Sequence, residues 1–386
     1  MQADAPRESR TSLAALIVIG TGAMTSATLS PVMLGLYIDE LRLTASQASL
    51  ALAAENGAYA LGLLLFYLIL HRARRPMLAA TGLGIMVVTS LLTARAGGFV
   101  PLLAIRAVFG LAMGFTASTV FAAYAGRADP QRVWAIATFV NLTYAAILLT
   151  LSGWIAQTFG LTGIVAVLAM VAVIGLACTR LIPPAPPRAE REVRSGGTEN
   201  GGVINLPAIC GALALLCLYA GHTTLWSFQE RMGLAVGLDR SQVGVLLGIS
   251  VLGAIIGAVL SVSAGHRFGQ RGPNALAFAG LIASALLLAL PMMAAYVAGA
   301  VIVKTAWFFG LPFILGALAR LDRSGRWSSM GAALLALGSA IGPAIGATLA
   351  SYGAHMIGVL AAGLYLISFL FTVPLFAADR SIPAHH

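Results

Sequence analysis

Charged residues are scarce in this sequence. Asp, Glu, Lys and Arg together make up 9% of its 386 residues, against roughly 25% in ordinary soluble domains. Hydrophobic residues make up 59%. A soluble protein of this composition would aggregate, so the composition indicates a membrane protein. The net charge of +10 does not predict nucleic-acid binding, because the arginines lie in short loops between apolar runs, where they orient helices against lipid headgroups.

Cysteine pairs and catalytic motifs are lacking as well. Cys178, Cys210 and Cys217 fall in apolar stretches without CxxC spacing, so we expect neither disulfides nor a metal site. The sequence contains no HExxH, GxSxG or paired-carboxylate motif, and nothing that resembles a channel filter loop. We therefore predict that the protein is neither an enzyme nor a channel, and that it uses no cofactor.

Long apolar runs are what the sequence does contain, and about 20 apolar residues suffice to span a bilayer. The first run is too long for a cleaved signal peptide. The twelve predicted spans are 12–38, 45–70, 76–95, 99–125, 133–157, 161–182, 204–228, 241–263, 273–291, 293–318, 328–350 and 355–377. A Pro- and Gly-rich polar stretch at 183–203 predicts a flexible linker. The expected fold is an all-α membrane protein with two six-helix bundles, 1–182 and 204–386.

The basic residues are distributed unevenly between the predicted loops. If the N-terminus lies inside the cell, the outer segments hold only four of the 23 basic residues, which are Arg42, Arg95, Arg231 and Arg240. Arg106 and Lys304 lie within spans, and the remaining seventeen fall in inner segments. Such a bias sets the orientation of membrane helices. We therefore predict a multi-pass protein of the bacterial inner (plasma) membrane with both termini in the cytoplasm.

The two halves of the sequence are similar at an offset of 195 residues. The matched pairs are Leu43 with Leu238, Ser46 with Ser241, Gln47 with Gln242, Gly62 with Gly257, His71 with His266 and Arg72 with Arg267. Chance similarity between helices rich in Leu, Ala and Gly is the alternative explanation. A parallel repeat of six spans favours a two-domain transporter whose site lies between the domains near the bilayer midplane.

Two stretches resemble motifs of the major facilitator superfamily. Residues 265–271, GHRFGQR, are similar to the family's G-x-x-x-D-R-x-G-R-R, with His266 in place of the usual Asp, and the first-half loop at 71–75 is more degenerate. Residues 106–114 match R-x-x-x-G-x-x-x-G. The resemblance implies alternating access between two bundles. On these repeated loops we expect the inner gate to be steadied by Arg72, Arg75, Gly265, Arg267, Gly269 and Arg271.

Glu55, Arg106 and Lys304 are the charges that lie deep in predicted spans. At ~1.5 Å per residue they lie roughly 15, 10 and 16 Å below the outer ends of the second, fourth and tenth spans. A charge at the bilayer centre costs roughly 2.5–3.5 kcal/mol, so it is usually functional. One acid against two bases leaves a positive charge, which favours an anion clamp made by Arg106 and Lys304. Alternatively, Arg106 and Glu55 only neutralise each other within the packing.

Lys304 is the only lysine in the chain, and a fixed charge could have been an arginine, so we expect it to act in substrate binding or coupling. Polar and aromatic side chains on other spans are further candidates for substrate binding. They are Asn141, Tyr144, Tyr59, Tyr219, His222, Trp226 and Trp307. For each aromatic residue the alternative is packing or anchoring at the membrane interface, and for His222 an interhelical hydrogen bond.

These features predict a secondary active transporter that moves a small organic anion, bearing a carboxylate or a phosphate, by alternating access. Glu55 is the predicted carrier of a coupling proton, and sodium coupling lacks a cluster of acidic ligands. We expect a monomer in the bilayer with no nucleic-acid partner. The alternative is a proton-driven multidrug or metabolite exporter. Such exporters usually carry G-x-x-x-G-P-x-x-G-G in the fifth span, which residues 141–149 lack.

Overall fold

The structure is a computed structural model, which describes residues 10–69, 75–182, 206–321 and 326–379. Within these ranges the chain is helical, with no strand. The first half contains α1 (Arg10–Asp39), α2 (Ala45–Ile69), α3 (Arg75–Thr93), α4 (Phe99–Ala125), α5 (Pro130–Cys178) and the short η1 (Thr179–Leu181). The second half contains α7 (Leu206–Ala235), α8 (Arg240–Phe268), α9 (Arg271–Ala289), α10 (Met293–Leu321), α11 (Arg326–Leu349), the short η2 (Ala350–Tyr352) and α12 (Ala354–Asp379). The predicted linker, 183–203, lies outside the described residues.

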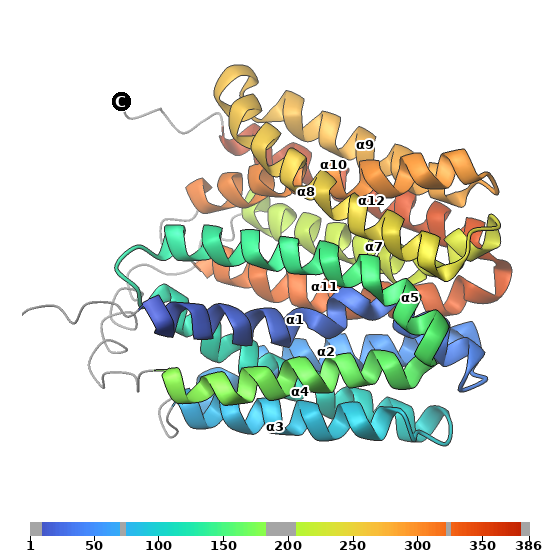
Figure 1. The fold of residues 1–386 in the computed structure, drawn as a ribbon. Helices are drawn as coiled ribbons and strands as arrows, with labels where there is room; N and C mark the ends of the chain where they lie inside the picture. Colours follow the sequence, from blue (N-terminus) through green and yellow to red (C-terminus); the bar gives the residue numbers. More distant parts are fainter. Residues whose placement is uncertain (1–9, 70–74, 183–205, 322–325, 380–386) are drawn as a thin grey trace, which may run out of the picture.

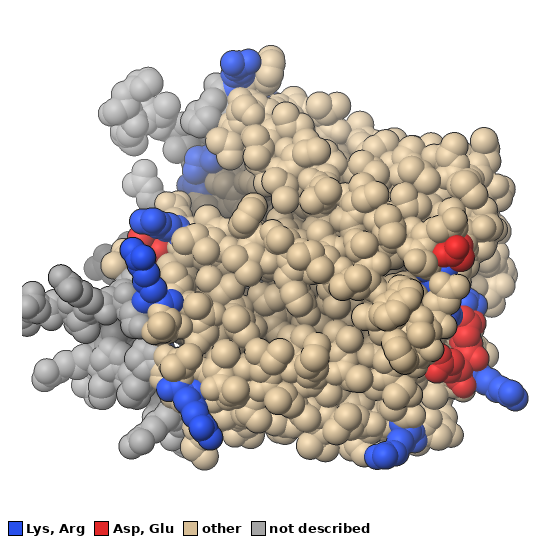
Figure 2. Space-filling model, viewed as in Figure 1, with Lys and Arg blue, Asp and Glu red and all other residues tan. Residues whose placement is uncertain are grey.

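The helices run side by side and reverse direction from one to the next (Figure 1). We call the end of the bundle where α1 begins and α12 ends the terminal face, and the opposite end the distal face. Charged side chains gather at these two faces, and an uncharged belt separates them (Figure 2). Eleven of the described helices are long and apolar enough to cross a membrane. The molecule is therefore a multi-pass membrane protein.

Helix α5 contains two spans rather than one, which brings the total to twelve. Its backbone breaks at Gly160, where φ is 59° and ψ is −150°, a conformation that a residue without Cβ adopts readily. The backbone N–H of Leu161 donates to both carboxylate oxygens of Glu40, at 3.0 Å each, and so caps the second arm. The chain reverses here, and the two arms of α5 lie apart in Figure 1.

Two helices extend further than the sequence analysis predicted. Helix α7 continues to Ala235 rather than ending at 228, so that it includes Glu230, which is only 1% exposed. The predicted seventh span, which ended before this residue, was therefore too short. Helix α8 continues to Phe268, so Gly265 and Arg267 belong to its end and not to a loop. In both cases polar residues interrupt the apolar run before the helix ends.

The repeat seen in the sequence reappears in the packing. Gly62 of α2 lies so close to α4 that an added Cβ would come within 2.6 Å of the carbonyl oxygen of Leu111. Its counterpart Gly257 of α8 lies even closer to α10, because an added Cβ would be 2.2 Å from the carbonyl oxygen of Thr305. Small residues allow such close backbone approach between membrane helices. The pairs α2–α4 and α8–α10 are therefore built in the same way.

The two halves meet mainly in the distal part of the bundle, through α1 against α7, α2 against α11 and the first arm of α5 against α8. Ser49 donates to the carbonyl of Pro343 at 2.6 Å, and an added Cβ on Gly244 would lie 2.8 Å from the carbonyl of Leu149. Toward the terminal face α5 and α8 instead expose large side chains, such as Phe139 at 61% and Val259 at 64%. The close contacts between the halves named here thus lie on the distal side.

Candidate functional site

The buried charges of the first half form one ion pair. Arg106 of α4 donates to Oε2 of Glu55 in α2 from Nε at 2.9 Å and from Nη2 at 2.5 Å. The same Nη2 donates to the hydroxyl of Ser26 in α1 at 2.5 Å. The guanidinium carbon lies 4.1 Å from the centre of the Phe109 ring. This pair joins three helices and neutralises both charges.

Close packing seals this pair. Gly110 and Gly114 follow Arg106 at four-residue spacing, so all three lie on the α4 surface that faces α2. A Cβ on Gly110 would overlap the backbone of Glu55, and one on Gly114 would overlap the carbonyl of Tyr59. Arg106 is 0% exposed and Glu55 is 2% exposed. In this conformation Arg106 therefore cannot contact a ligand, and the predicted clamp between Arg106 and Lys304 is not assembled.

Lys304 of α10 lies instead among aromatic side chains of the second half. Its Nζ is 3.6 Å from the centre of the Trp226 ring and 3.4 Å from Nε2 of His222. The His222 ring stacks on Trp307 at 4.0 Å between centroids, and Trp307 packs edge-on against Tyr219 at 5.0 Å. We call these five residues the lysine cluster. Among the described residues no carboxylate forms an ion pair with Lys304.

Helix geometry explains why the lysine cluster forms. Tyr219, His222 and Trp226 follow one another at three- and four-residue spacing on α7, so they project from one face. Lys304 and Trp307 are three residues apart on α10 and face them. Lys304, His222 and Tyr219 are half-buried, whereas Trp226 and Trp307 are buried at 8% and 4% exposure. The structure thus brings together all five predicted second-half residues.

The first-half candidates lie on α2 and α5, outside the lysine cluster itself. The hydroxyl of Tyr144 in α5 is 3.1 Å from that of Thr25 in α1. Asn141 lies one turn away from Tyr144 on the same helix and is half-buried. Tyr59 of α2 is also half-buried, and its hydroxyl group is near enough to Tyr219 for an electrostatic interaction across the interface.

Helix α1 connects the two buried centres. Pro31 has no N–H to donate to the carbonyl of Ala27, four residues earlier. That carbonyl accepts from the indole N–H of Trp226 at 3.1 Å and from the hydroxyl of Ser30 at 3.0 Å. The preceding residue, Ser26, is the one bound by Arg106. A kink in α1 therefore places neighbouring residues against the ion pair and the lysine cluster.

A comparison with protein families assigns this architecture. Residues 15–321 match the model of the Major Facilitator Superfamily. The chain belongs to this superfamily. None of the curated proteins matches the sequence.

Two kinds of solved structure in the superfamily share the fold. The nucleoside transporter NupG superposes with a TM-score of 0.75 at 13% identity, over 97% of this chain and 100% of that one. A bacterial homologue of the human lysosomal transporter Spinster, in an inward-facing and unoccupied conformation, gives 0.60 at 16% identity, over 96% and 95%. At these identities the likeness shows a common fold.

The residues that resemble the superfamily's gate motif lie at the terminal face. Arg271 donates to the carbonyl of Phe376, near the C-terminal end of α12, from Nε at 3.1 Å and from Nη2 at 2.5 Å. Gly269 ends α8 with a φ of 67°. Gly265 packs near Phe313, Arg267 is exposed, and Arg75 begins α3. Arg72 lies outside the described residues. The bond of Arg271 joins two helices of one half and does not cross between the halves.

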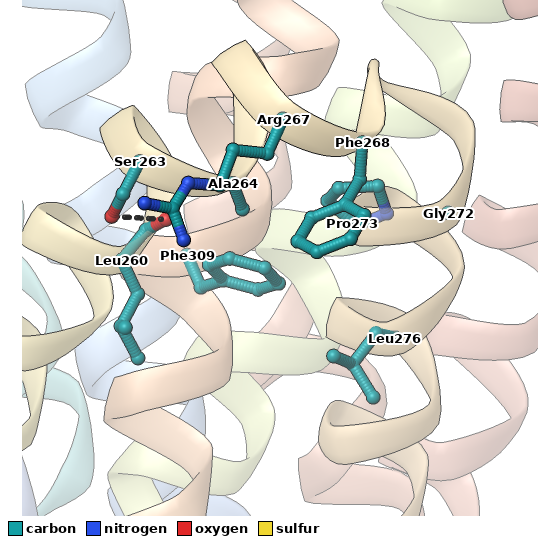
Figure 3. Close-up of a pocket in the computed structure, with 9 residues that line it drawn as sticks. All are labelled: Leu260, Ser263, Ala264, Arg267, Phe268, Gly272, Pro273, Leu276 and Phe309. Atoms are coloured by element: carbon teal, nitrogen blue, oxygen red, sulfur yellow. Dashed lines mark hydrogen bonds between the residues drawn. The ribbon is translucent and has the colours of Figure 1, made fainter.

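One described cavity is separate from the lysine cluster. It measures about 570 Å³ and lies between the terminal ends of α8, α9 and α10. Figure 3 shows Arg267 and Phe268 near one end of this cavity and Leu276 near the other. Its walls are almost entirely apolar and it lacks Lys304. Of the predicted residues it includes only Arg267, so we do not assign it to the transport site.

The sequence analysis missed an ionic cluster at the distal face. Asp39 of α1 binds Arg231 of α7 at 2.9 Å and also Arg240 of α8, and Nε of Arg240 lies 3.2 Å from Glu230. The polar stretch after residue 228 seemed to end the seventh span. The apolar residues 232–236 that follow it were the signal that the helix continues and carries Glu230 inward.

Proposed function

We propose that the protein is a secondary transporter that carries a small organic anion, bearing a carboxylate or a phosphate, by alternating access. The observation that supports this proposal is the environment of Lys304, a cation in the middle of a membrane helix without an acidic partner among the described residues. The charge of Arg106 is balanced by Glu55. The surplus positive charge therefore lies at Lys304, where an anionic ligand would neutralise it.

The neighbours of Lys304 suit such a ligand. Trp226 attracts the ammonium group through its ring face but leaves the ammonium hydrogen atoms available to oxygen acceptors. His222 and Tyr219 supply further polar atoms, and Trp307 supplies an apolar wall. Lys304, His222 and Tyr219 are half-buried, so ligand access requires only a modest opening of the interface.

For the transport cycle we propose that the terminal face is cytoplasmic and that the structure is the inward-facing state of a monomer in the bacterial plasma membrane. The arginine bias of the sequence supports this orientation. The described contacts between the halves lie on the distal side, as expected when the path from the outside is closed. The release of these contacts would open the lysine cluster to the other side.

We further propose that Glu55 carries the coupling proton. Ser26 binds Arg106 of the ion pair, and the next residue, Ala27, binds Trp226 of the lysine cluster. A ligand that binds at the lysine cluster and moves α1 would therefore weaken the contact with Arg106, and Glu55 could then take up a proton. Binding and protonation are then reciprocally linked. Glu55→Gln should abolish proton-driven accumulation in proteoliposomes yet retain substrate exchange. An uphill gradient sustained by this variant would exclude Glu55 as the proton carrier.

A thermal-shift screen on purified protein tests the substrate class. The probes are benzoate, succinate and glucose 6-phosphate as anions, uridine as a neutral solute, and tetraphenylphosphonium as a lipophilic cation. We expect an anion to raise the melting temperature of the wild type and not that of Lys304→Ala. Stabilisation by tetraphenylphosphonium that survives this substitution, with no anion effect, would favour the exporter alternative. If uridine were the only probe that raised the melting temperature, the result would indicate a neutral substrate.

A further inference from the structure

The distal interface holds a buried acid that the proposed transport site does not use. Glu230, in the last two turns of α7, is 1% exposed. It packs so tightly against α1 that an added Cβ on Gly35 would overlap its carboxylate. One oxygen lies 3.2 Å from Nε of Arg240. In the described structure, however, neither of its oxygens accepts a hydrogen bond.

The two nearby arginines donate their hydrogen bonds to a different acid. Arg231 donates from Nη1 to both oxygens of Asp39, at 2.9 and 3.0 Å, and Nη2 of Arg240 donates to Asp39 as well. The side chain of Asp39 is 39% exposed, so water can also solvate it. Asp39, the exposed acid, thus accepts the hydrogen bonds of both arginines. Glu230, the buried acid, has only a charge contact with Arg240.

A further group near Glu230, the hydroxyl of Tyr296, offers it no hydrogen bond either. Tyr296 approaches from α10, but its hydroxyl donates to the backbone carbonyl of Gln229 at 3.0 Å. The charged and titratable groups that face Glu230 are therefore Asp39 from α1, Arg240 from α8, Tyr296 from α10 and Arg231 from its own helix.

A buried carboxylate without hydrogen-bond donors is costly, and protonation removes most of that cost. The closed interface therefore favours the neutral form of Glu230. Opening of the distal face moves α1 away from α7 and α8 and admits water, which favours the ionised form. The proton occupancy of Glu230 is consequently linked to the position of the two halves.

We propose that Glu230 is a proton-binding group that controls the distal gate. It holds a proton while the gate is closed and releases it when the gate opens, so acid conditions favour the closed state. One linked proton changes the closed-to-open ratio by up to about tenfold per pH unit. The inference rests on alternating access of the two halves and not on the substrate class, so failure of the anion proposal would leave it intact.

A distance measurement across the distal face tests the proposal. Leu92 at the end of α3 and Met292 before α10 lie on opposite halves at the distal face and are 44% and 57% exposed. Spin labels are attached to the two new cysteines of a Leu92→Cys/Met292→Cys variant. Its three native cysteines are replaced by Ser. Pulsed electron resonance then gives the distance distribution between pH 5 and pH 9. The short distance corresponds to the closed distal gate and the long distance to the open one. In the protein that retains Glu230, we expect the population with the short distance to grow as the pH falls.

Glu230→Gln should keep the short distance at every pH, because the amide is neutral like the protonated acid. If Glu230 is instead an ionised partner that holds Arg240, the same variant should show the long distance at every pH. That result would overturn the proposal, and so would a Glu230→Gln variant whose pH response equals that of the wild type. The proposal would also fail if the distance distribution of the wild type does not change with pH. Glu40→Gln is the control, because Glu40 caps Leu161 within one half, and its pH response should be unchanged.

Discussion

The fourth and tenth membrane helices, α4 and α10, occupy corresponding places in the two halves, and each carries one base in its middle part. On α4 the base is an arginine with an acidic partner, no exposed surface and a serine that completes its bonding. On α10 it is a lysine among aromatic rings, half-buried, with no acid beside it in the described structure. The fold repeats itself, but the chemistry does not. A paired charge suits a joint between helices, whereas an unpaired charge suits a ligand.

This difference predicts that replacing Arg106 by alanine mainly lowers stability, whereas replacing Lys304 by alanine mainly weakens ligand binding. Arg106→Ala leaves the Glu55 carboxylate buried without its partner, and breaking a buried pair costs about 3–5 kcal/mol. We expect poor expression and a fall in melting temperature larger than that of Lys304→Ala or Gly110→Ala. The double variant Arg106→Ala/Glu55→Ala should recover part of the loss, because no charge remains unpaired. A stable Arg106→Ala protein that only lost its ligand would place Arg106 in the binding site after all.

Lys304→Ala is the matching change in the second half. Loss of a charged hydrogen bond to the ligand, worth about 1.5–3 kcal/mol, should weaken anion binding about 10- to 100-fold. The melting temperature without ligand should stay level or rise, because the alanine needs no solvation. Titration calorimetry and differential scanning fluorimetry measure the two effects separately. A fall in stability without a change in affinity would make Lys304 a structural residue like Arg106.

Gly110→Ala tests how the first-half pair is sealed. The new methyl group would overlap the backbone of Glu55, and overpacking of this kind typically costs about 1–3 kcal/mol. We expect a lower melting temperature and a looser contact between α2 and α4. Gly84→Ala on α3 is the matched control, because no atom lies within 4 Å of its added Cβ. Equal stability of both variants would show that the α2–α4 contact has room for a methyl group.

The smallest effect is expected where the two regions communicate. Trp226→Phe keeps an aromatic ring beside Lys304 but removes the indole N–H that binds the carbonyl of Ala27. A neutral hydrogen bond contributes about 0.5–1.5 kcal/mol, so the melting temperature should fall by a few degrees at most. Trp134→Phe is the control, because Trp134 packs on Phe121 and Tyr124 within one half. If the link through α1 carries coupling, Trp226→Phe alone should reduce proton-driven accumulation while exchange persists.

The sequence predicted the helical architecture well. The twelve apolar runs were recognisable because the bilayer thickness fixes their length, and the start of most helices was correct within three residues. Spacing along a helix also predicted that Tyr219, His222 and Trp226 share a face. The break within α5 at Gly160 was marked by the gap between two predicted spans. Local rules of length and periodicity were sufficient for these features.

The tertiary structure alone decided which of the buried charges is paired. Glu55 and Arg106 are 51 residues apart, and Trp226 and Ala27 are 199 residues apart, so their contacts depend on which helices meet and at what depth. The apolar residues after Glu230 signal that its helix continues, but its contact with α1 depends on how α1 lies over the end of α7. A sequence specifies how long a helix is and which of its faces is apolar. The partner of a charged group is set only when the helices pack, because the electrostatic energy depends on distances of a few ångströms between atoms far apart in the chain.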